Sequence, residues 1–278
     1  MRAGRVTYCS GFAGVAPPNS FIAMLFPCPM PKFVEPPKPG QRARHPVDQL
    51  RTQLWFEAVL HRSGLPTAHF LELMLEPASA DRSADGVPRP RKWRSYQSGN
   101  RVPQRRVGKP YAVAVAESRF PGTAAYFENP MWQLLKGESL GIPEIDAALR
   151  DLSPDIDALL FEVAEPPEAG VFRPREFDGE AADRLVALAS FAALSAAVLL
   201  MAKAELIASL PLRETAYSAY LALQPALAKT ADVGMFSAPL FRFIDERFKL
   251  WVFANNQFRL EVRVFSERLP RPPAEDEM

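Results

Sequence analysis

Apolar residues recur at helical spacing along most of the chain. Between residues 47 and 58 they lie three or four positions apart, which predicts a helix that begins after Pro46 and stops at Gly64. A second helix is expected after Thr67, because threonine is a residue type that caps helix N-termini. It should end before residues 76 to 90, whose composition is that of a loop.

Helical character resumes at Arg91 and stops at Gly99, a residue type that ends helices in the left-handed conformation. A further helix is expected from about residue 110 to 120, and two short turns in residues 121 to 137. Together these elements predict a helical front domain of residues 47–137.

The back half is also predicted to be helical. Ser153 and Pro154 are a typical N-cap and first-turn pair. Further elements are expected as helices at 179–209, 213–229 and about 241–251, followed by a strand-like segment at 258–265. The sequence therefore predicts a mostly α-helical fold, with a helical bundle in residues 138–265.

Both ends of the chain have the composition of disordered tails. Residues 1–46 carry nine prolines and no sustained apolar period, and the Pro-rich, acidic residues 266–278 close the chain. The early prolines also interrupt any apolar run before it reaches the length of a secretory signal. Both cysteines, Cys9 and Cys28, lie in the first tail, so we expect no disulfide framework and a cytoplasmic protein.

Residues 185–202 hold no charged side chain and therefore have to be weighed as a membrane span. Arg184 and Lys203 close the run at both ends, and its length reaches only the lower limit for a span. Seven of its residues are alanines, which suit close packing of helices in a protein core. We favour a buried central helix over a membrane span.

The net charge of +1 hides a strong asymmetry. Residues 38–119 hold 15 Lys and Arg against 7 Asp and Glu, whereas residues 120–278 hold 15 against 24. Within residues 82–109 nine basic residues face one acid, Asp85. This balance predicts a front half that binds a polyanion and an acidic back half with a different task.

The stretch RKWRSYQSGNRVPQ, residues 91 to 104, lies at the centre of the basic region. On a helix Trp93 and Tyr96 share a face and can anchor the segment in a core, with Gly99 and Pro103 as further structural anchors at its end. The other side chains are of types that read base edges in DNA. These candidate base contacts are Arg91, Lys92, Arg94, Ser95 and Gln97. The candidate phosphate contacts are Arg82, Arg89, Arg101, Arg105, Arg106 and Lys109.

The run YQSGNRVP, residues 96 to 103, resembles the end of the recognition helix in helix-turn-helix domains of Cro-type phage repressors. The preceding GLPTAHFLELML is similar to the second helix of that family, with Thr67 as its cap and Leu71 and Leu75 at its apolar positions. The resemblance covers about residues 47 to 120 and implies a small helical DNA-binding domain. The whole chain also resembles uncharacterised proteobacterial proteins that start with an HPVDQLRTQLWF-like segment.

The chain departs from the family pattern in two places. Residues 76–90 separate the two helices, where family members have a tight turn. Glu72 stands where the family has a small residue. The insertion is interpreted as a wing that adds phosphate contacts, and the alternative is that the two helices do not form the motif.

The sequence contains no recognisable catalytic, metal-binding or cofactor-binding motif. Its three histidines, His45, His61 and His69, are interpreted as surface or capping residues, since no third ligand or nucleophile follows at a familiar spacing. We therefore expect neither an enzyme nor a metal or cofactor. A nuclease would have only Asp81, Asp85 and Glu117 near the basic region, which does not favour it.

The function expected from these patterns is sequence-specific binding of double-stranded DNA by a bacterial regulator or by a protein of phage biology or defence. The acidic back half would form a homo-oligomer or bind a protein partner, with the Leu/Ala-rich helix at 185–209 as the interface candidate. Two alternatives are a scaffold whose basic half docks on an acidic partner, and a membrane-associated effector that inserts residues 185–202. A solvated basic face without a partner, or an RNA-binding face, would have the same composition.

Overall fold

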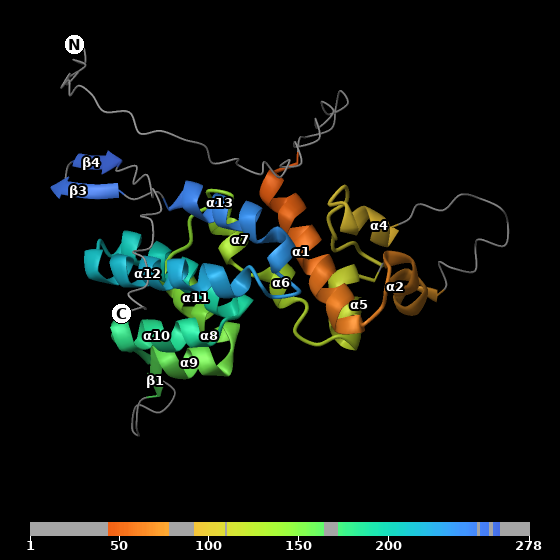
Figure 1. The fold of residues 1–278 in the computed structure, drawn as a ribbon, viewed down its shortest axis with the longest axis horizontal. Coiled ribbons are helices and arrows are strands. Elements are labelled where there is room, and N and C mark those ends of the chain that lie inside the picture. Colours follow the sequence, from red (N-terminus) through yellow and green to blue (C-terminus); the bar gives the residue numbers. More distant parts are fainter. Residues whose placement is uncertain are drawn as a thin grey trace, which may run out of the picture. The chain divides into compact units, whose positions relative to one another are not determined.

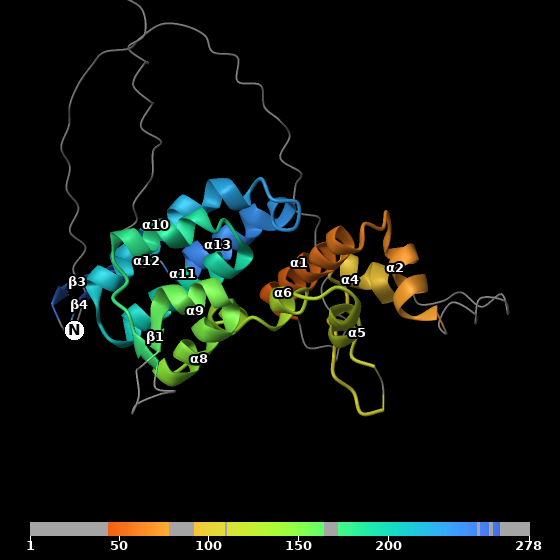
Figure 2. The ribbon, with the colours of Figure 1, turned by 90° about the horizontal axis from the view of Figure 1, so that it is seen from below.

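The computed structural model describes residues 44–77, 92–108, 110–163 and 172–248, and the backbone of 251–255 and 258–261. It is mostly helical, as the sequence predicts (Figures 1 and 2). The front helices are α1 (Pro46–Ser63), α2 (Ala68–Leu75), α4 (Lys92–Gln97), α5 (Ala112–Arg119), α6 (Ala125–Glu128) and α7 (Met131–Leu135). The back helices are α8 (Ile142–Leu152), α9 (Pro154–Leu160), α10 (Gly179–Ala187), α11 (Phe191–Leu206), α12 (Leu210–Leu227) and α13 (Ser237–Arg247), with a 3-10 turn, η2 (Gly234–Phe236), before α13.

Two antiparallel hairpins complete the described elements. Strand β1 (Phe161–Val163) pairs with β2 (Phe172–Pro174), with Phe161 opposite Pro174. Strand β3 (Trp251–Asn255) pairs with β4 (Phe258–Glu261), so the strand-like pattern near residue 258 is confirmed at its start. The sequence pattern indicated neither α8 nor the first hairpin.

Helix α1 has clear signals at both ends. The His45 side chain accepts a hydrogen bond from the Val47 backbone N–H at 3.3 Å, and Pro46 occupies the first turn. Gly64 ends the helix at φ 65°, in the left-handed region. The predicted helix therefore lies where its capping residues place it.

Helix α1 also belongs to two hydrophobic cores. Its later residues Trp55, Phe56 and Val59 pack with α2, α4 and α5 in a front core, whereas its earlier apolar residues pack with α7 and the back helices. Both views show α1 between α2, α4 and α5 on one side and α13 on the other (Figures 1 and 2). The described residues from Arg44 onwards belong to one compact unit, and a division into two domains at residue 137 stays a prediction.

The prediction of one long helix at 179–209 is wrong, because this segment forms two helices, α10 and α11, separated by a turn. The break contains Ala189 at φ 44°, followed by Ser190, whose hydroxyl caps α11 by accepting from the Ala193 N–H at 3.2 Å. The far end of α11 repeats the arrangement with Ala208 at φ 52° and the capping residue Ser209. Two tight turns therefore bring α12 back against both α11 and α10.

Helix α11 is the centre of the back core. Its side chains from Ala193 to Ala202 are all buried, so the apolar run at 185–202 is largely core, as favoured above. Within the part of the chain that the structure describes, no helix is both long and apolar enough to cross a membrane. Within the predicted interface at 185–209 the chain itself covers residues 193–202, whereas Leu188, Leu206 and Ile207 are exposed, and binding of a partner by this segment stays a prediction.

The predicted tails lie almost entirely outside the described residues, which begin at Arg44. The same holds for most of the insertion at 76–90, since residues 78–91 are not described.

Candidate nucleic-acid interface

The short helix α4 is fixed to the front core by its two aromatic residues. Trp93 and Tyr96 are buried, with exposed fractions of 0% and 2%. Both rings lie 5.7 Å from the ring of Trp55 on α1, and they meet each other edge to face at the same distance. The prediction that these two residues anchor the segment is confirmed.

Two carboxylates of α2 hold the N-terminal end of α4. Glu76 forms an ion pair with the Lys92 ammonium, and Glu72 accepts hydrogen bonds from the backbone N–H groups of Lys92 and Trp93. Burial raises the pKa of the Glu72 carboxyl, the nearby Glu76 adds to the rise, and these two N–H groups lower it in part. Glu72, which departs from the family pattern, thus ties α2 to α4. Lys92, a predicted base contact, is paired with Glu76 and half-buried.

Arg94 and Gln97 form the exposed face of α4. They lie three residues apart on the helix and so share a face that is distinct from the face of Trp93 and Tyr96. The Arg94 guanidinium makes no ion pair or side-chain hydrogen bond within the described part of the chain. Ser95 is half-buried. Of the predicted base contacts that the structure describes, Arg94 and Gln97 are therefore the two available to a ligand.

The chain leaves α4 through a turn that packs against α1. Gly99 has φ 69°, and a Cβ at this position would meet Gln49 and lie 3.2 Å from Gln53. The Arg101 N–H donates to the Ser95 carbonyl at 3.1 Å. Pro103, the last predicted anchor, is buried. Both predicted features of this exit, the glycine in the left-handed region and the anchoring proline, are present.

The exit loop carries three arginines. Arg105 lies 4.9 Å from the centre of the Tyr111 ring and pairs with Glu128 at 2.8 Å, and Arg106 donates to Gln104 at 3.2 Å. Burial raises the pKa of Tyr96 to about 12, while Arg101 and Arg106 lower it in part. The charges of both arginines thus act on the Tyr96 hydroxyl, and together with Arg105 they make the chain that follows α4 strongly positive.

A cavity of about 380 Å³ opens beside this charge, lined by Arg105, Arg106, Tyr111 and Glu128 among others. Its acids are already engaged: Glu128 pairs with Arg105, and Glu117 accepts hydrogen bonds from the backbone N–H groups of Gly122 and Ala124 at 2.6 Å each. Burial alone would raise the pKa of the Glu117 carboxyl, but these hydrogen bonds hold it below its ordinary value. Glu117 thus holds the turn that precedes α6, a role that the sequence pattern did not reveal.

The remaining predicted contacts lie outside the described residues: Arg82, Arg89, Arg91 and Lys109. Asp81 and Asp85, two of the three acids considered for a nuclease, lie outside them as well. Within the described ranges, no three His, Cys, Asp or Glu side chains are grouped as metal ligands.

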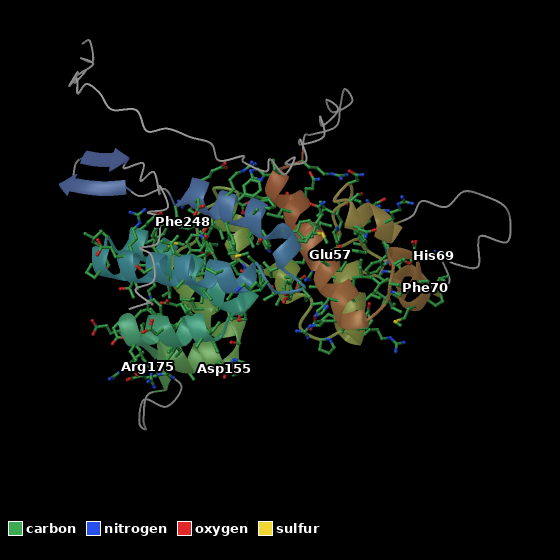
Figure 3. All side chains as sticks on the ribbon, in the orientation of Figure 1. Glu57, His69, Phe70, Asp155, Arg175 and Phe248 are labelled. Atoms are coloured by element: carbon green, nitrogen blue, oxygen red, sulfur yellow. The ribbon has the colours of Figure 1, made fainter. Side chains whose placement is uncertain are left out.

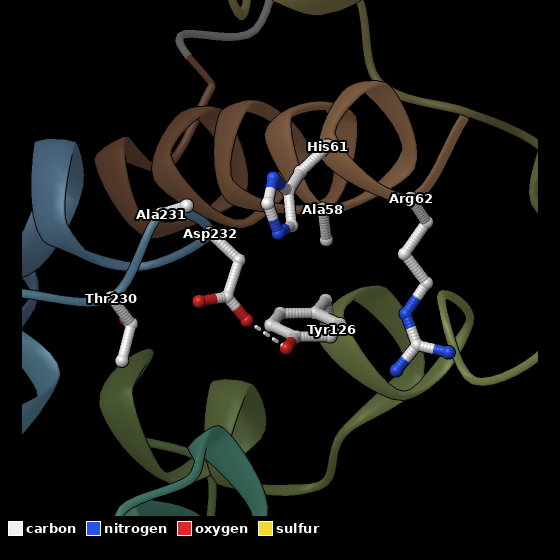
Figure 4. A pocket seen from close by; sticks show the side chains of 7 residues that line it. All are labelled: Ala58, His61, Arg62, Tyr126, Thr230, Ala231 and Asp232. Carbon is white, nitrogen blue, oxygen red and sulfur yellow. Dashed lines mark hydrogen bonds between the residues drawn. The ribbon is translucent and has the colours of Figure 1, made fainter. Parts of the chain in front are cut away.

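The histidines occupy three different settings. His45 caps α1, and His69 is exposed on α2 beside Phe70, with ring centres 6.0 Å apart (Figure 3). His61 lines a polar cavity of about 380 Å³ together with Arg62, Tyr126 and Asp232 (Figure 4). The Tyr126 hydroxyl donates to the Asp232 carboxylate there. No sequence signal indicated this cavity, because its residues come from three distant segments of the chain.

Comparison with models of known protein families gives no match, and neither curated proteins nor solved structures match the chain significantly.

Proposed function

We propose that the protein binds double-stranded DNA through the exposed face of α4 and the loop that follows it. The observation that carries the proposal is that α4 has one face buried in the core and another face exposed to solvent. Trp93 and Tyr96 hold the helix rigidly in the core, and Arg94 and Gln97 point away from it. Arginine forms two hydrogen bonds to guanine and glutamine forms two to adenine in the major groove.

The loop supplies the attraction to phosphates. Residues 92 to 108 contain five basic residues and no acid. Arg101, Arg105 and Arg106 lie at the C-terminal end of α4, where they would contact the DNA backbone beside the bases that the helix reads. Arg105 would exchange its partner Glu128 for a phosphate.

The length of α4 sets the scale of recognition. Six residues at about 1.5 Å each make a helix of about 9 Å, which spans about three base pairs at 3.4 Å per pair. So short a site favours binding as a homo-oligomer on paired half-sites. Regulation of transcription in a bacterial cytoplasm is the simplest role for such a protein.

The test uses the full-length chain, because α1 contributes to both cores and a front-half fragment would cut the second core. A duplex is first selected from a random pool, and its affinity is then measured by fluorescence anisotropy. Three phosphate contacts would weaken binding about fortyfold when salt rises from about 50 to about 200 mM. The variant Arg94→Ala/Gln97→Ala should lose tenfold or more, since each two-bonded base contact contributes about 1–3 kcal/mol.

The matched control is Arg184→Ala, which removes an exposed arginine from α10 in the back half. It should bind the selected duplex like the unchanged protein. If the Arg94→Ala/Gln97→Ala variant and the control bind the duplex equally well and with the same salt dependence, α4 reads no bases and the protein binds phosphates only. Failure to select any duplex at low salt would exclude the proposal.

One observation favours a second candidate, a scaffold that docks on an acidic protein. Lys92 and Arg105 are already paired with the carboxylates of Glu76 and Glu128. The same side chains would accept carboxylates of a partner. Polyglutamate added as a competitor in the anisotropy experiment separates the two, because a DNA reader retains its selected duplex while an acid-binding surface releases it.

A further inference from the structure

A third cavity, of about 590 Å³, lies where the two cores meet. It is lined by α8, by the start of α11 and by residues 122–130, with Arg62 of α1 at its side. Tyr126, one of its lining residues, packs against both hydrophobic cores and stacks on Phe191 with ring centres 4.7 Å apart. The cavity has the volume of a typical small-molecule site.

Most of its wall is apolar, and the amide of its polar residue Asn129 is already hydrogen-bonded within the fold. Ala192, Leu152 and the stacked pair of Tyr126 and Phe191 supply carbon surface. The polar Asn129 uses its amide within the fold, donating to Ser195 at 2.8 Å and accepting from the Met131 N–H at 3.0 Å. A ligand would therefore meet a largely apolar and aromatic wall.

Arg62 is the exception. Its guanidinium donates to the Pro121 carbonyl, a neutral group, and forms no ion pair with any carboxylate in the described part of the chain. Arg62 and Tyr126 also line the polar cavity described above, so both residues border the two cavities (Figure 4). The carbonyl holds the guanidinium in place while leaving its positive charge uncompensated, which suits a carboxylate that accepts two hydrogen bonds.

The two acidic residues that line this cavity would repel a bound anion to different degrees. Glu128 is neutralised by Arg105 at 2.8 Å, whereas the exposed Asp151 makes no ion pair or hydrogen bond among the described residues. Asp151 would therefore oppose a bound anion, and its removal offers a test with the opposite sign.

We propose that this cavity binds a small aromatic carboxylate, with the carboxylate on Arg62 and the ring against Tyr126 and Phe191. The inference does not depend on DNA binding, because it concerns different residues and is measured without DNA. Since Tyr126 packs on both cores, a ligand here would contact the junction between the half that carries α4 and the back half.

The experiment titrates the full-length chain with benzoate and follows binding by saturation-transfer NMR. Benzamide, which has the same shape without the charge, serves as the neutral probe. We expect benzoate to bind and benzamide to bind at least tenfold more weakly. Arg62→Gln should weaken benzoate binding about tenfold, and Asp151→Asn should strengthen it about twofold.

Two further variants make the result decisive. Ala192→Leu keeps Arg62 but fills the cavity, so it should abolish benzoate binding, whereas Arg119→Gln, which changes an exposed arginine outside the cavity, should leave it unchanged. Equal affinity for benzoate and benzamide, or benzoate binding that survives in both Arg62→Gln and Ala192→Leu, would overturn the proposal. Absence of benzoate binding to the unchanged protein would overturn it as well.

Discussion

Replacement of Gly99 by alanine tests whether the exit of α4 is packed against α1 as described. Gly99 has φ 69°, where an alanine costs about 1–2 kcal/mol because its Cβ approaches the following carbonyl oxygen. The added Cβ would also meet Gln49 and lie 3.2 Å from two side-chain atoms of Gln53. Moving these side chains away from their preferred rotamers should add about 0.5–1.5 kcal/mol.

Gly64 provides the matched control. It has nearly the same backbone conformation, φ 65°, but no atom lies within 4 Å of the position that a Cβ would take. Gly64→Ala should therefore show the backbone cost alone, and Gly99→Ala the backbone cost together with the steric cost. Truncation of both glutamines in Gly99→Ala/Gln49→Ala/Gln53→Ala should remove the steric part and return the loss to that of Gly64→Ala.

Urea unfolding of the four proteins measures these differences. In thermal unfolding, each kcal/mol should correspond to a shift of about 2–4 °C for a folded region of this size. Equal losses for Gly99→Ala and Gly64→Ala, or no recovery after truncation of the glutamines, would refute the described packing of α4 on α1. No loss in either variant would refute the left-handed backbone at both glycines.

Three further predictions concern carboxylates. Glu117→Gln weakens the hydrogen bonds that hold the turn before α6 and should lower the free energy of unfolding by about 1 kcal/mol at neutral pH. Because the folded-state pKa of Glu117 is lowered, this deficit should vanish as acid protonates the unchanged protein below the ordinary value of 4.5. Glu57 on α1 has a pKa raised by burial, so its contribution to stability falls as pH rises from 4.5 through the folded-state pKa, and Glu57→Gln should gain more at neutral pH than in acid (Figure 3). Urea unfolding across this pH range checks both, and a pH-independent difference would contradict either. Glu128→Gln removes the carboxylate that Arg105 must leave before it can contact a phosphate, so it should tighten DNA binding; an unchanged affinity would mean that Arg105 contacts no phosphate.

Local signals predicted the elements of the fold well. Gly64, Gly99 and Ser153 end or begin helices through their own backbone or side chain, so the sequence shows their role directly. The break between α10 and α11 could not be predicted in the same way. Ala189 adopts a positive φ without being glycine, and Ser190 as a capping residue was the only local sign.

For the candidate interface, the sequence predicts which residues of α4 are buried in the core better than it predicts which basic side chains are free on the surface. The three-residue spacing of Trp93 and Tyr96 indicates their common burial. The pairing of Lys92 with Glu76 and of Arg105 with Glu128 depends on how distant segments pack, so the sequence alone suggested more free basic side chains than the structure provides.

The two tight turns at Ala189 and Ala208 have a consequence for the order of folding. They bring α12 against both α11 and α10, the two helices that precede it in the chain, so these contacts close only short loops. Contacts of this kind form fast, whereas the front core needs α1 to meet residues more than seventy positions later, such as Phe127. We expect residues 179–227 to gain protection first in pulse-labelled hydrogen exchange, and earlier protection of α1 would contradict this order. The half that carries α4 would then assemble last, against a back half that is already folded.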